Sequence, residues 1–522
     1  MAEYASHQEP KSHPLTPDFL SFIILIIAAI FRFYALDIKP PHFDEGVNGW
    51  FIDQLQQTGT FKYDPENYHG PLHFYVLYVF SIFGGHNLWA LRLPVAIVGL
   101  LSTFFLLKLD RFFPVSACRW AGLAIAVSPA FTFYNRYAIH ESWMVLFMIL
   151  LTYGIFLACE NSWKSAAWLI PLSITGMVLT KETYIIHLIC LGLAWLVTIL
   201  FSKISQDGCS FSEFPRPPTF KIFLKPMLLC LFLLVFFYSG NFFYWQGLHG
   251  IYQTFTPWID TAFGHGDTGT GHIKPFYYWF TLILQYEPYA LLSIIPCLIL
   301  LLPSKRKFRI LAIFAVGNLL AFSIIDYKTP WCILPILWPF FILAGLLPIL
   351  LKNHALILIA NLTCFTLIFY SATHSYLLNF YNYDDDSEPY VYVQTTRDYF
   401  TVMDPIIAIA QSDPQYYHIK GNLFLTSYYP IPWTLKDFTN IAYYDPEKDL
   451  TASDADFLII QSDAQEKIES QLKLSYYKKT FRLRSGQAAC VIYYRQSLFP
   501  SRLVQYDSLF TPENTGERQE VF

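Results

Sequence analysis

Polar residues with catalytic potential gather in short connections between long apolar runs. Three such connections, 135–141, 180–184 and 326–331, each contain a cation and a carboxylate. Because each connection joins two apolar runs directly, its residues are held at the ends of those runs. Arg and Lys bind anions such as a lipid phosphate, so the three connections together predict an anion site. For any one of these cations, pairing with the neighbouring carboxylate or snorkelling toward water is an equally good interpretation.

Two adjacent carboxylates, Asp44 and Glu45, follow the first apolar run after a few residues. Pro40 and Pro41 stiffen the backbone just before them. A helical pattern follows over 46–57, and Asp44 is suited to cap its N-terminus, so capping plus solvation is one interpretation of the pair. The other is a general base. Desolvation at a low-dielectric surface raises the pKa of a carboxyl, which then takes a proton from an acceptor hydroxyl.

Histidines lie near the same connections. His69 and His73 are spaced four residues apart at the start of the short run 71–84, and His272 lies in the long connection 245–275. Histidines combined with carboxylates bind divalent metals. No tight ligand motif is present, however, so we expect no cofactor and leave a divalent metal as an open alternative.

One carboxylate falls within an apolar run. Glu287 lies between Tyr286 and Pro288 in the run 276–302. An ionisable residue inside a membrane span is costly and therefore favours a functional interpretation. Pairing with a Tyr or Lys would satisfy the same carboxylate, and the sequence does not decide between the two.

The composition is that of a polytopic membrane protein. Of the 522 residues, 54% are hydrophobic and only 14% are charged, with a mean hydropathy of +0.36. The net charge of -4 does not indicate the excess of basic residues that is typical of nucleic-acid-binding proteins. Of the nine cysteines only Cys490 lies in the polar C-terminal region, so we expect no disulfide framework.

The placement of Lys and Arg predicts the topology. The run 19–36 is too long for a signal-peptide core, so we interpret it as a retained anchor. With the N-terminus in the cytoplasm, the clusters around 108–119, 203–225 and 305–309 fall inside only if 71–84 lies on the outer surface. We therefore predict an interfacial helix at 71–84 and eleven spans. The predicted spans are 19–36, 88–107, 119–135, 142–159, 166–180, 184–201, 226–244, 276–302, 310–325, 331–351 and 354–376.

Three regions follow from this topology. We predict a cytoplasmic tail over 1–18, an all-α transmembrane domain over 19–376 with outer loops 37–87 and 245–275, and an exoplasmic α/β domain over 377–522 with a loose tail after about 500. Alternating or apolar segments in the third region predict strands. These segments are 422–427, 456–461, 476–484 and 488–495, with a helix expected near 463–472.

Several motifs resemble a known superfamily. The sequence FDEG after the first span, HGPLHFYVLYVFSIFG, LRLPVAIVGLL, TKET at 180–183 and KTPW at 328–331 are similar to motifs of the C-type glycosyltransferases, abbreviated GT-C. Within that superfamily the chain resembles the protein O-mannosyltransferase and aminoarabinose-transferase type. Further segments, including HGDTGTGHIKPFYYWF and YVQTTRDYF, resemble a prokaryotic subfamily labelled flippase-activity-associated.

The resemblance implies a polyprenyl-phosphate sugar as donor, transfer at the outer face by inversion, and no nucleotide sugar. It places Asp44 near the acceptor, Glu45 at an adjacent acidic position and Glu141 at a second acidic position. It also matches 71–84 to the juxtamembrane helix of the family. Arg136, Lys181 and Lys328 would hold the donor phosphate, and the candidates to support the site are His69, His140, Glu182, His272, Glu287 and Trp331.

We therefore predict a hexosyl- or pentosyltransferase that uses a lipid-phosphate sugar and an acceptor that is a protein, a glycan or a lipid. Two alternatives stay open. One is a non-enzymatic protein associated with flipping or transport of lipid-linked glycans, and the other is a structural or receptor protein. The only Asn-X-Thr triplet, beginning at Asn361, lies inside a predicted span, which favours a prokaryotic inner membrane over a glycosylating organelle.

Overall fold

The structure is a computed structural model that describes residues 18–66, 69–204, 219–263, 271–300, 306–448, 453–484 and 486–512. Most of the predicted N-terminal tail and of the connection 202–225, the Gly-rich part of loop 245–275, and the end of the C-terminal tail lie outside these residues. The chain divides into two compact units. The first unit comprises Met1–Leu36 and Leu55–Tyr381, and the second comprises Asp37–Gln54 and Asn382–Phe522. The predicted domain limits stay a prediction.

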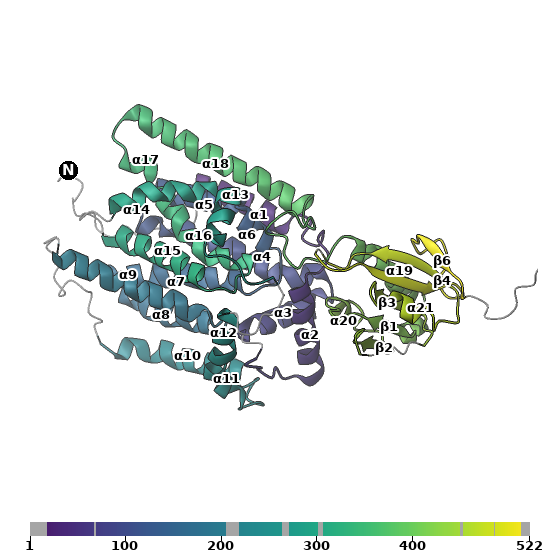
Figure 1. Ribbon diagram of the computed structural model, residues 1–522. Coiled ribbons are helices and arrows are strands. Elements are labelled where there is room, and N and C mark those ends of the chain that lie inside the picture. The colour runs from purple at the N-terminus through teal and green to yellow at the C-terminus, as the bar shows by residue number, and fades with distance from the viewer. Residues whose placement is uncertain are drawn as a thin grey trace, which may run out of the picture. The chain divides into compact units, whose positions relative to one another are not determined.

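The first unit is helical (Figure 1). Helix α7 packs against α8, and α9 packs against α15. The α-helices are α1 (Phe19–Phe33), α3 (Leu72–Gly84), α4 (Leu88–Leu107), α5 (Val115–Val127), α6 (Pro129–Tyr134), α7 (Glu141–Cys159), α8 (Trp163–Val178), α9 (Tyr184–Ile204), α10 (Lys221–Tyr238), α11 (Gly247–Gln253), α12 (Phe255–Ala262), α13 (Tyr278–Tyr286), α14 (Ile294–Leu300), α15 (Arg306–Ile324), α16 (Leu334–Ala344), α17 (Leu347–Leu350) and α18 (His354–Phe380). Short 3-10 helices are η1 (Lys108–Arg111), η3 (Pro288–Ser293) and η4 (Pro330–Ile333).

Several of these helices are long and apolar enough to cross a membrane, so the chain is a multi-pass membrane protein. Within the described residues, seven single helices pass this test, and the bent pair Tyr278–Tyr286 with Pro288–Leu298 raises the number to eight. The predicted count of eleven spans is not confirmed. The predicted spans 19–36, 119–135 and 166–180 correspond to α1, α5 and α8, which have 15, 13 and 16 residues. A helix of 16 residues is only about 24 Å long.

Local sequence explains two of the shorter helices. Helix α5 ends at Ser128, whose extended backbone precedes Pro129, the first residue of α6. A residue before proline is disfavoured in helical conformation, so one predicted span becomes two helices. Helix α3 covers the predicted interfacial segment and ends at Gly85, which has a φ of 81°. Its 13 residues give it a length of about 20 Å, too short to span a bilayer core of about 30 Å.

The second unit contains a six-stranded mixed sheet. The strand order is β2-β1-β3-β5-β4-β6, and β2, β1 and β3 are parallel to one another whereas the remaining pairs are antiparallel. The four predicted strands are confirmed. The strands at Ile441–Tyr444 and Ser508–Phe510 were not predicted, and the second of them lies in the segment that was expected to be a loose tail. The strands are β1 (Gly421–Phe424), β2 (Ile441–Tyr444), β3 (Phe457–Gln461), β4 (Tyr476–Phe481), β5 (Cys490–Arg495) and β6 (Ser508–Phe510), and the helical elements are α2 (Phe43–Thr58, to Gln54 in this unit), α19 (Asp398–Ser412), η5 (Pro414–His418), α20 (Ile431–Thr434) and α21 (Gln465–Glu469).

Both faces of this sheet are buried. Along β3, Phe457 and Ile459 belong to one core cluster, which also contains Ile406 of α19. Leu458 and Ile460 point to the opposite face and belong to a second cluster with residues of α21. Because side chains alternate along a strand, an apolar run such as FLIIQ can fill both cores, as in sheets covered on two sides.

Helix α2 is part of the second unit up to Gln54 and packs closely on α20. A Cβ at Gly46 would lie 2.5 Å from the Cα of Pro430, and a Cβ at Gly49 would lie 2.2 Å from the indole of Trp433. Any larger residue at either position would therefore push the two helices apart. The predicted helix 46–57 exists but begins earlier, at Phe43.

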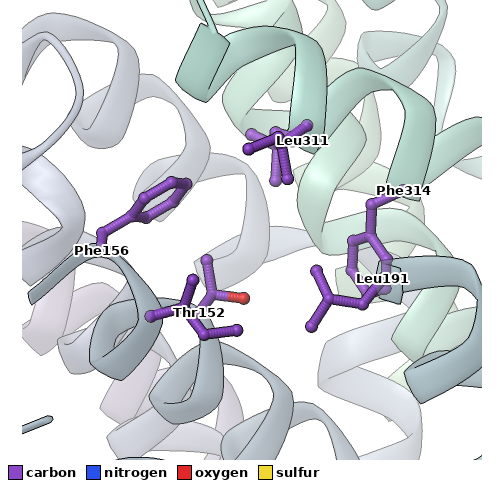
Figure 2. Close-up of a pocket in the computed structure, with 7 residues that line it drawn as sticks. Thr152, Phe156, Leu191, Leu311 and Phe314 are labelled. Carbon is purple, nitrogen blue, oxygen red and sulfur yellow. The ribbon is translucent and has the colours of Figure 1, made fainter. Parts of the chain in front are cut away.

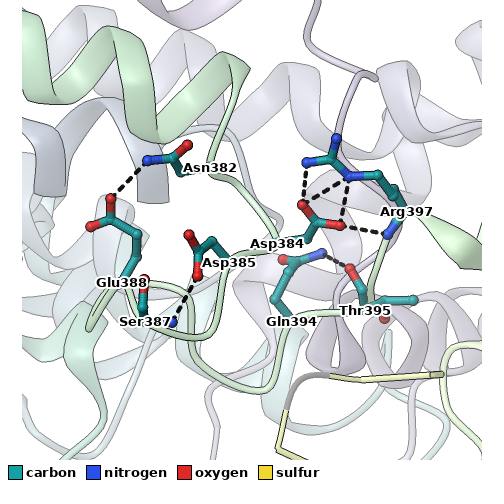
Figure 3. A network of polar contacts seen from close by, with 8 residues as sticks. All are labelled: Asn382, Asp384, Asp385, Ser387, Glu388, Gln394, Thr395 and Arg397. Atoms are coloured by element: carbon teal, nitrogen blue, oxygen red, sulfur yellow. Dashed lines mark hydrogen bonds and ion pairs between the residues drawn. The ribbon is translucent and has the colours of Figure 1, made fainter.

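Polar contacts order the first residues of this unit after α18 (Figure 3). The guanidinium of Arg397 donates to both carboxylate oxygens of Asp384, and the main-chain N–H of Arg397 donates to the same carboxylate. Asn382 donates to Glu388 at 3.0 Å. These bonds tie the segment 382–397 to itself ahead of α19.

Candidate functional site

A buried ion pair joins two of the predicted connections in the first unit. Lys181 Nζ donates to Glu141 Oε1 at 2.6 Å, and both residues are less than a tenth exposed. Glu141 begins α7, whereas Lys181 lies between α8 and α9. Cys332 of η4, which directly follows the third connection, also reaches this pair, because its Sγ lies 3.8 Å from Glu141 Oε1. Segments far apart in the sequence therefore meet at one carboxylate.

The environment keeps Lys181 charged. Burial alone would lower the pKa of this ammonium, but the carboxylates of Glu141 and Glu182 outweigh it and raise the pKa well above its ordinary value. An ammonium has three N–H donors. Among the described residues its one hydrogen bond goes to Glu141, so two donors are left for another acceptor.

Three histidines lie beside the ion pair. The ring centroids of His73 and His140 are 4.2 Å apart, and those of His69 and His140 are 4.7 Å apart. Trp143 Nε1 donates to His73 Nδ1 at 3.0 Å, which fixes the ring of His73. Burial, followed by the nearness of His73, His69 and Lys181, lowers the pKa of His140 well below its ordinary value, so this imidazole is neutral.

Backbone pairing holds His69 against the Lys181 segment. His69 and Lys181 form an antiparallel bridge, and Gly70 N donates to Thr180 O at 3.0 Å. A Cβ at Gly70 would lie 2.2 Å from the carbonyl oxygen of Leu179, so only glycine permits this approach. As a result His69 Nδ1 lies 3.5 Å from Glu182 Oε2.

Arg136 is buried elsewhere in the first unit. Its guanidinium donates to the carbonyl oxygens of Phe31, Tyr34 and Ala35 at the end of α1, at 3.2, 2.6 and 2.5 Å. It also lies 5.0 Å from the ring centroid of Phe380. These contacts satisfy carbonyls that the end of a helix leaves without partners.

Lys328 is held in a similar way. Its ammonium donates to the carbonyl oxygens of Lys274, at 3.0 Å, and of Ile325. Burial lowers its pKa, with a smaller opposing effect of Asp326. The main-chain N–H of Lys328 donates to the carbonyl of His272, whose ring stacks on Tyr327 at 4.6 Å. The described contacts of Lys328 and His272 therefore do not include Glu141 or Lys181.

Two further predicted residues have structural contacts. Glu287 lies at the 107° bend between α13 and η3 and accepts hydrogen bonds from Ser128 Oγ at 2.7 Å and Ala130 N at 2.9 Å. The carboxylate therefore caps the start of α6. Trp331 packs edge-on against Tyr134, with ring centroids 6.2 Å apart.

The predicted acidic pair of the first connection lies in the second unit, on α2. Glu45 is fully buried and its Oε2 accepts a hydrogen bond from the main-chain N–H of His42, as in a capping box. The ring of His42 accepts from Asp44 N at 3.1 Å, so His42 and not Asp44 caps the helix. The Asp44 side chain stays 37% exposed.

Sequence reasoning missed two members of the cluster. The cysteines were considered as possible disulfide partners, so Cys332 was not singled out, and neither was Trp143. A usable signal existed for each, because Cys332 directly follows the KTPW motif and Trp143 lies two residues after Glu141. No group of three His, Cys, Asp or Glu side chains among the described residues has the arrangement of a metal site.

A small pocket lies among α7, α9 and α15, but it offers no chemistry (Figure 2). Its lining is apolar apart from Thr152, whose hydroxyl donates to the carbonyl of Met148 within the same helix. The lining residues are Thr152, Ile155, Phe156, Leu191, Ile310, Leu311 and Phe314.

Residues 68–208 match the model of the dolichyl-phosphate-mannose-protein mannosyltransferase family. This segment contains Glu141, Lys181 and all three histidines of the cluster. No curated protein sequence matches the chain.

The chain resembles solved structures over most of its length. ArnT from Cupriavidus metallidurans bound to undecaprenyl phosphate has a TM-score of 0.59 and 14% identity, covering 93% of this chain and 99% of ArnT. The apo state of the same enzyme has a TM-score of 0.55 and 13% identity with the same coverage. The oligosaccharyltransferase of Archaeoglobus fulgidus has 12% identity, covers 91% of this chain and 73% of its own, and falls to a TM-score of 0.49. The chain therefore has the GT-C fold seen in ArnT, and its residues 68–208 match the dolichyl-phosphate-mannose-protein mannosyltransferase model.

Proposed function

We propose that the chain is an integral-membrane glycosyltransferase that moves a sugar from a polyprenyl-phosphate donor to an acceptor at the outer, periplasmic face of a cell membrane. One observation carries the proposal. The buried Lys181–Glu141 pair lies beside three histidines, within a fold shared with an enzyme whose structure holds undecaprenyl phosphate. The N-terminus in the cytoplasm and the second unit outside belong to the same proposal.

The chemistry needs a cation at the leaving group. When the bond between the anomeric carbon and the phosphate oxygen breaks, the electron pair leaves with the polyprenyl phosphate. Lys181 stays charged and has donors to spare, so it can neutralise the charge that develops on this oxygen. Glu141 holds the ammonium in place while this happens.

The acceptor hydroxyl must lose a proton as it attacks the anomeric carbon. Asp44 is the proposed base, and attack opposite the leaving phosphate inverts the anomeric configuration. Its side chain is one-third exposed and its main chain is fixed by His42, whereas Glu45 is engaged in the helix start. We therefore assign Asp44 to proton transfer and Glu45 to holding the segment.

The proposal is tested in membranes from cells that express the full chain. Undecaprenyl-phosphate mannose with a labelled sugar is the first donor, and the label in products separable from the donor is measured. Asp44→Asn is expected to lower transfer by about 100-fold or more. Asp386→Asn, a half-exposed carboxylate of the same unit, is the matched control and is expected to transfer normally.

Two outcomes would contradict the proposal. Labelled hexose and pentose donors that yield no more product than membranes without the chain would argue against an enzyme. Movement of labelled lipid across proteoliposomes that survives Asp44→Asn, without any transfer, would favour the non-enzymatic transport alternative.

A further inference from the structure

Several buried polar groups of the first unit lack hydrogen-bond partners among the described residues, and two of them lie beside the ion pair. Glu182 is 4% exposed and both of its carboxylate oxygens lack a hydrogen bond. His140 is also 4% exposed and its Nε2 lacks one. A buried polar group without a partner costs about 1–3 kcal/mol, so two in one place call for a ligand that supplies the missing bonds.

These two groups meet around His69. The ring of His69 lies 4.7 Å from the ring of His140, and its Nδ1 lies 3.5 Å from Glu182 Oε2. His140 directly precedes Glu141 and Glu182 directly follows Lys181, so the unpartnered groups flank the ion pair. The backbone bridge between His69 and Lys181 and the contact between the tilted rings of His73 and His140 position these groups.

The charges of this arrangement select the chemistry of the ligand. A phosphate is disfavoured beside the carboxylate of Glu182 and suits Lys181 instead. A divalent cation is disfavoured by the Lys181 ammonium, which also contributes to the lowered pKa of His140. A carboxylate accepts hydrogen bonds and a neutral imidazole accepts or donates one, which is the pattern that sugar hydroxyls complement.

We propose that Glu182, His140 and His69 form a subsite that binds the hydroxyl groups of the donor's sugar, next to the Lys181 that faces its phosphate. This inference rests on the proposed function and deepens it. Glu182 and His140 would thereby distinguish a lipid phosphate that carries a sugar from a bare one. The buried acceptors would also reject donors that lack the matching hydroxyl, because the partner atoms would again be left without bonds.

The test compares two ligands on the purified full chain. Binding of undecaprenyl phosphate and of a panel of undecaprenyl-phosphate hexoses and pentoses is measured, and the tightest sugar lipid is carried forward. Glu182→Gln is expected to weaken binding of this sugar lipid by about 10-fold or more while binding of bare undecaprenyl phosphate is unchanged. The matched control is Glu160→Gln, at the C-terminal end of α7, whereas Glu141 begins this helix. It is expected to leave the binding of both lipids unchanged.

Deoxy donors make the test specific. A donor lacking the hydroxyl bound by Glu182 should bind the wild type about as weakly as the full donor binds Glu182→Gln, with no further loss when the two changes are combined. His140→Gln should give the same pattern for a neighbouring hydroxyl. Such non-additivity would not arise from a general disturbance of folding.

Failure of this inference is distinct from failure of the proposed function. If the wild type binds neither lipid, the proposed function is wrong. If it binds both and transfers sugar, but every panel member binds no tighter than bare undecaprenyl phosphate, or Glu182→Gln keeps the preference, the subsite is wrong. A preference that a chelator abolishes and zinc restores would also overturn it, because a metal would then occupy the three side chains.

Discussion

Two buried cations of the first unit, Lys181 and Arg136, are held in opposite ways. Lys181 bonds to one carboxylate and keeps donors for another acceptor, whereas Arg136 bonds to main-chain carbonyls at the end of α1. If a cation that bonds to the carbonyls at a helix end turned to another ligand, those carbonyls would lose their hydrogen-bond partner. A cation paired with a carboxylate can add an anionic ligand and stay charged. Burial and charge alone therefore do not identify a ligand-binding cation, but the chemistry of its partners does.

Removal of the Lys181 ammonium is expected to have the largest effect on activity. Lys181→Met is expected to lower sugar transfer about 100-fold or more, since it removes the donor to the leaving phosphate and leaves Glu141 buried without its partner. Lys181→Arg keeps the charge and is the control for folding, with a smaller loss. Transfer at the wild-type rate in Lys181→Met membranes, normalised to folded protein, would show that this cation is dispensable.

The matching change at Arg136 should affect stability instead. Arg136→Met removes the charged hydrogen bonds to the carbonyls of Phe31, Arg32, Tyr34 and Ala35 and is expected to lower the free energy of unfolding by about 3 kcal/mol. Thermal unfolding of the detergent-solubilised chain measures this loss. The folded fraction should keep its affinity for undecaprenyl phosphate. A specific loss of that affinity without a change in melting temperature would instead place Arg136 in the donor site, as the family resemblance implies.

Another lysine–carboxylate pair, in the second unit, should make the stability of the chain depend on pH. Lys436 Nζ lies 3.4 Å from Asp53, whose pKa is raised to about 6, mainly by burial and despite Lys436. A carboxyl with a raised pKa binds a proton more tightly in the folded state. Its contribution to stability is therefore present in acid and is lost as the pH rises through about 6.

Asp53→Asn should flatten that dependence. The wild type is expected to lose about 1–3 kcal/mol of unfolding free energy from this group between pH 4 and pH 7, and the variant should not. Unfolding of the full chain monitored at several pH values provides the measurement. An equally steep pH profile in Asp53→Asn would mean that other groups carry it.

The smallest effect is expected at Glu45. Because its carboxylate bonds to the main-chain N–H of His42 at the start of α2, Glu45→Gln should keep one hydrogen bond and cost about 1 kcal/mol or less of stability. Transfer should fall far less than in Asp44→Asn. Equal losses in the two variants would show that Glu45 shares the catalytic role that the sequence allowed.

Part of the site followed from the sequence for a physical reason. The connections that carry Glu141 and Lys181 are only a few residues long, so both side chains must lie close to the end of a helix. The partners of Arg136 and Lys328 could not be predicted, because every residue has a main-chain carbonyl and the sequence does not show which of them a side chain reaches. The main-chain N–H partners of Glu45 and Glu287 could not be predicted for the same reason.

The fold shows a similar division. Apolar length predicted the long helices of the first unit, and alternating or apolar segments predicted four strands of the second, whereas the short strands β2 and β6 were missed. The segment Asp37–Gln54 belongs to the second unit, where two glycines let α2 approach α20. The local sequence pattern does not predict this contact. The break between α5 and α6 was marked by Ser128 and Pro129, but hydropathy alone merged the two helices.

The most direct test is a cryo-electron microscopy structure of the full chain with the tightest-binding undecaprenyl-phosphate sugar. We expect the phosphate on the Lys181 ammonium and the sugar hydroxyls on Glu182 and His140, while Arg136 keeps its carbonyl partners. A phosphate bound by Arg136 or Lys328, with Lys181 still bonded to Glu141 alone, would contradict it.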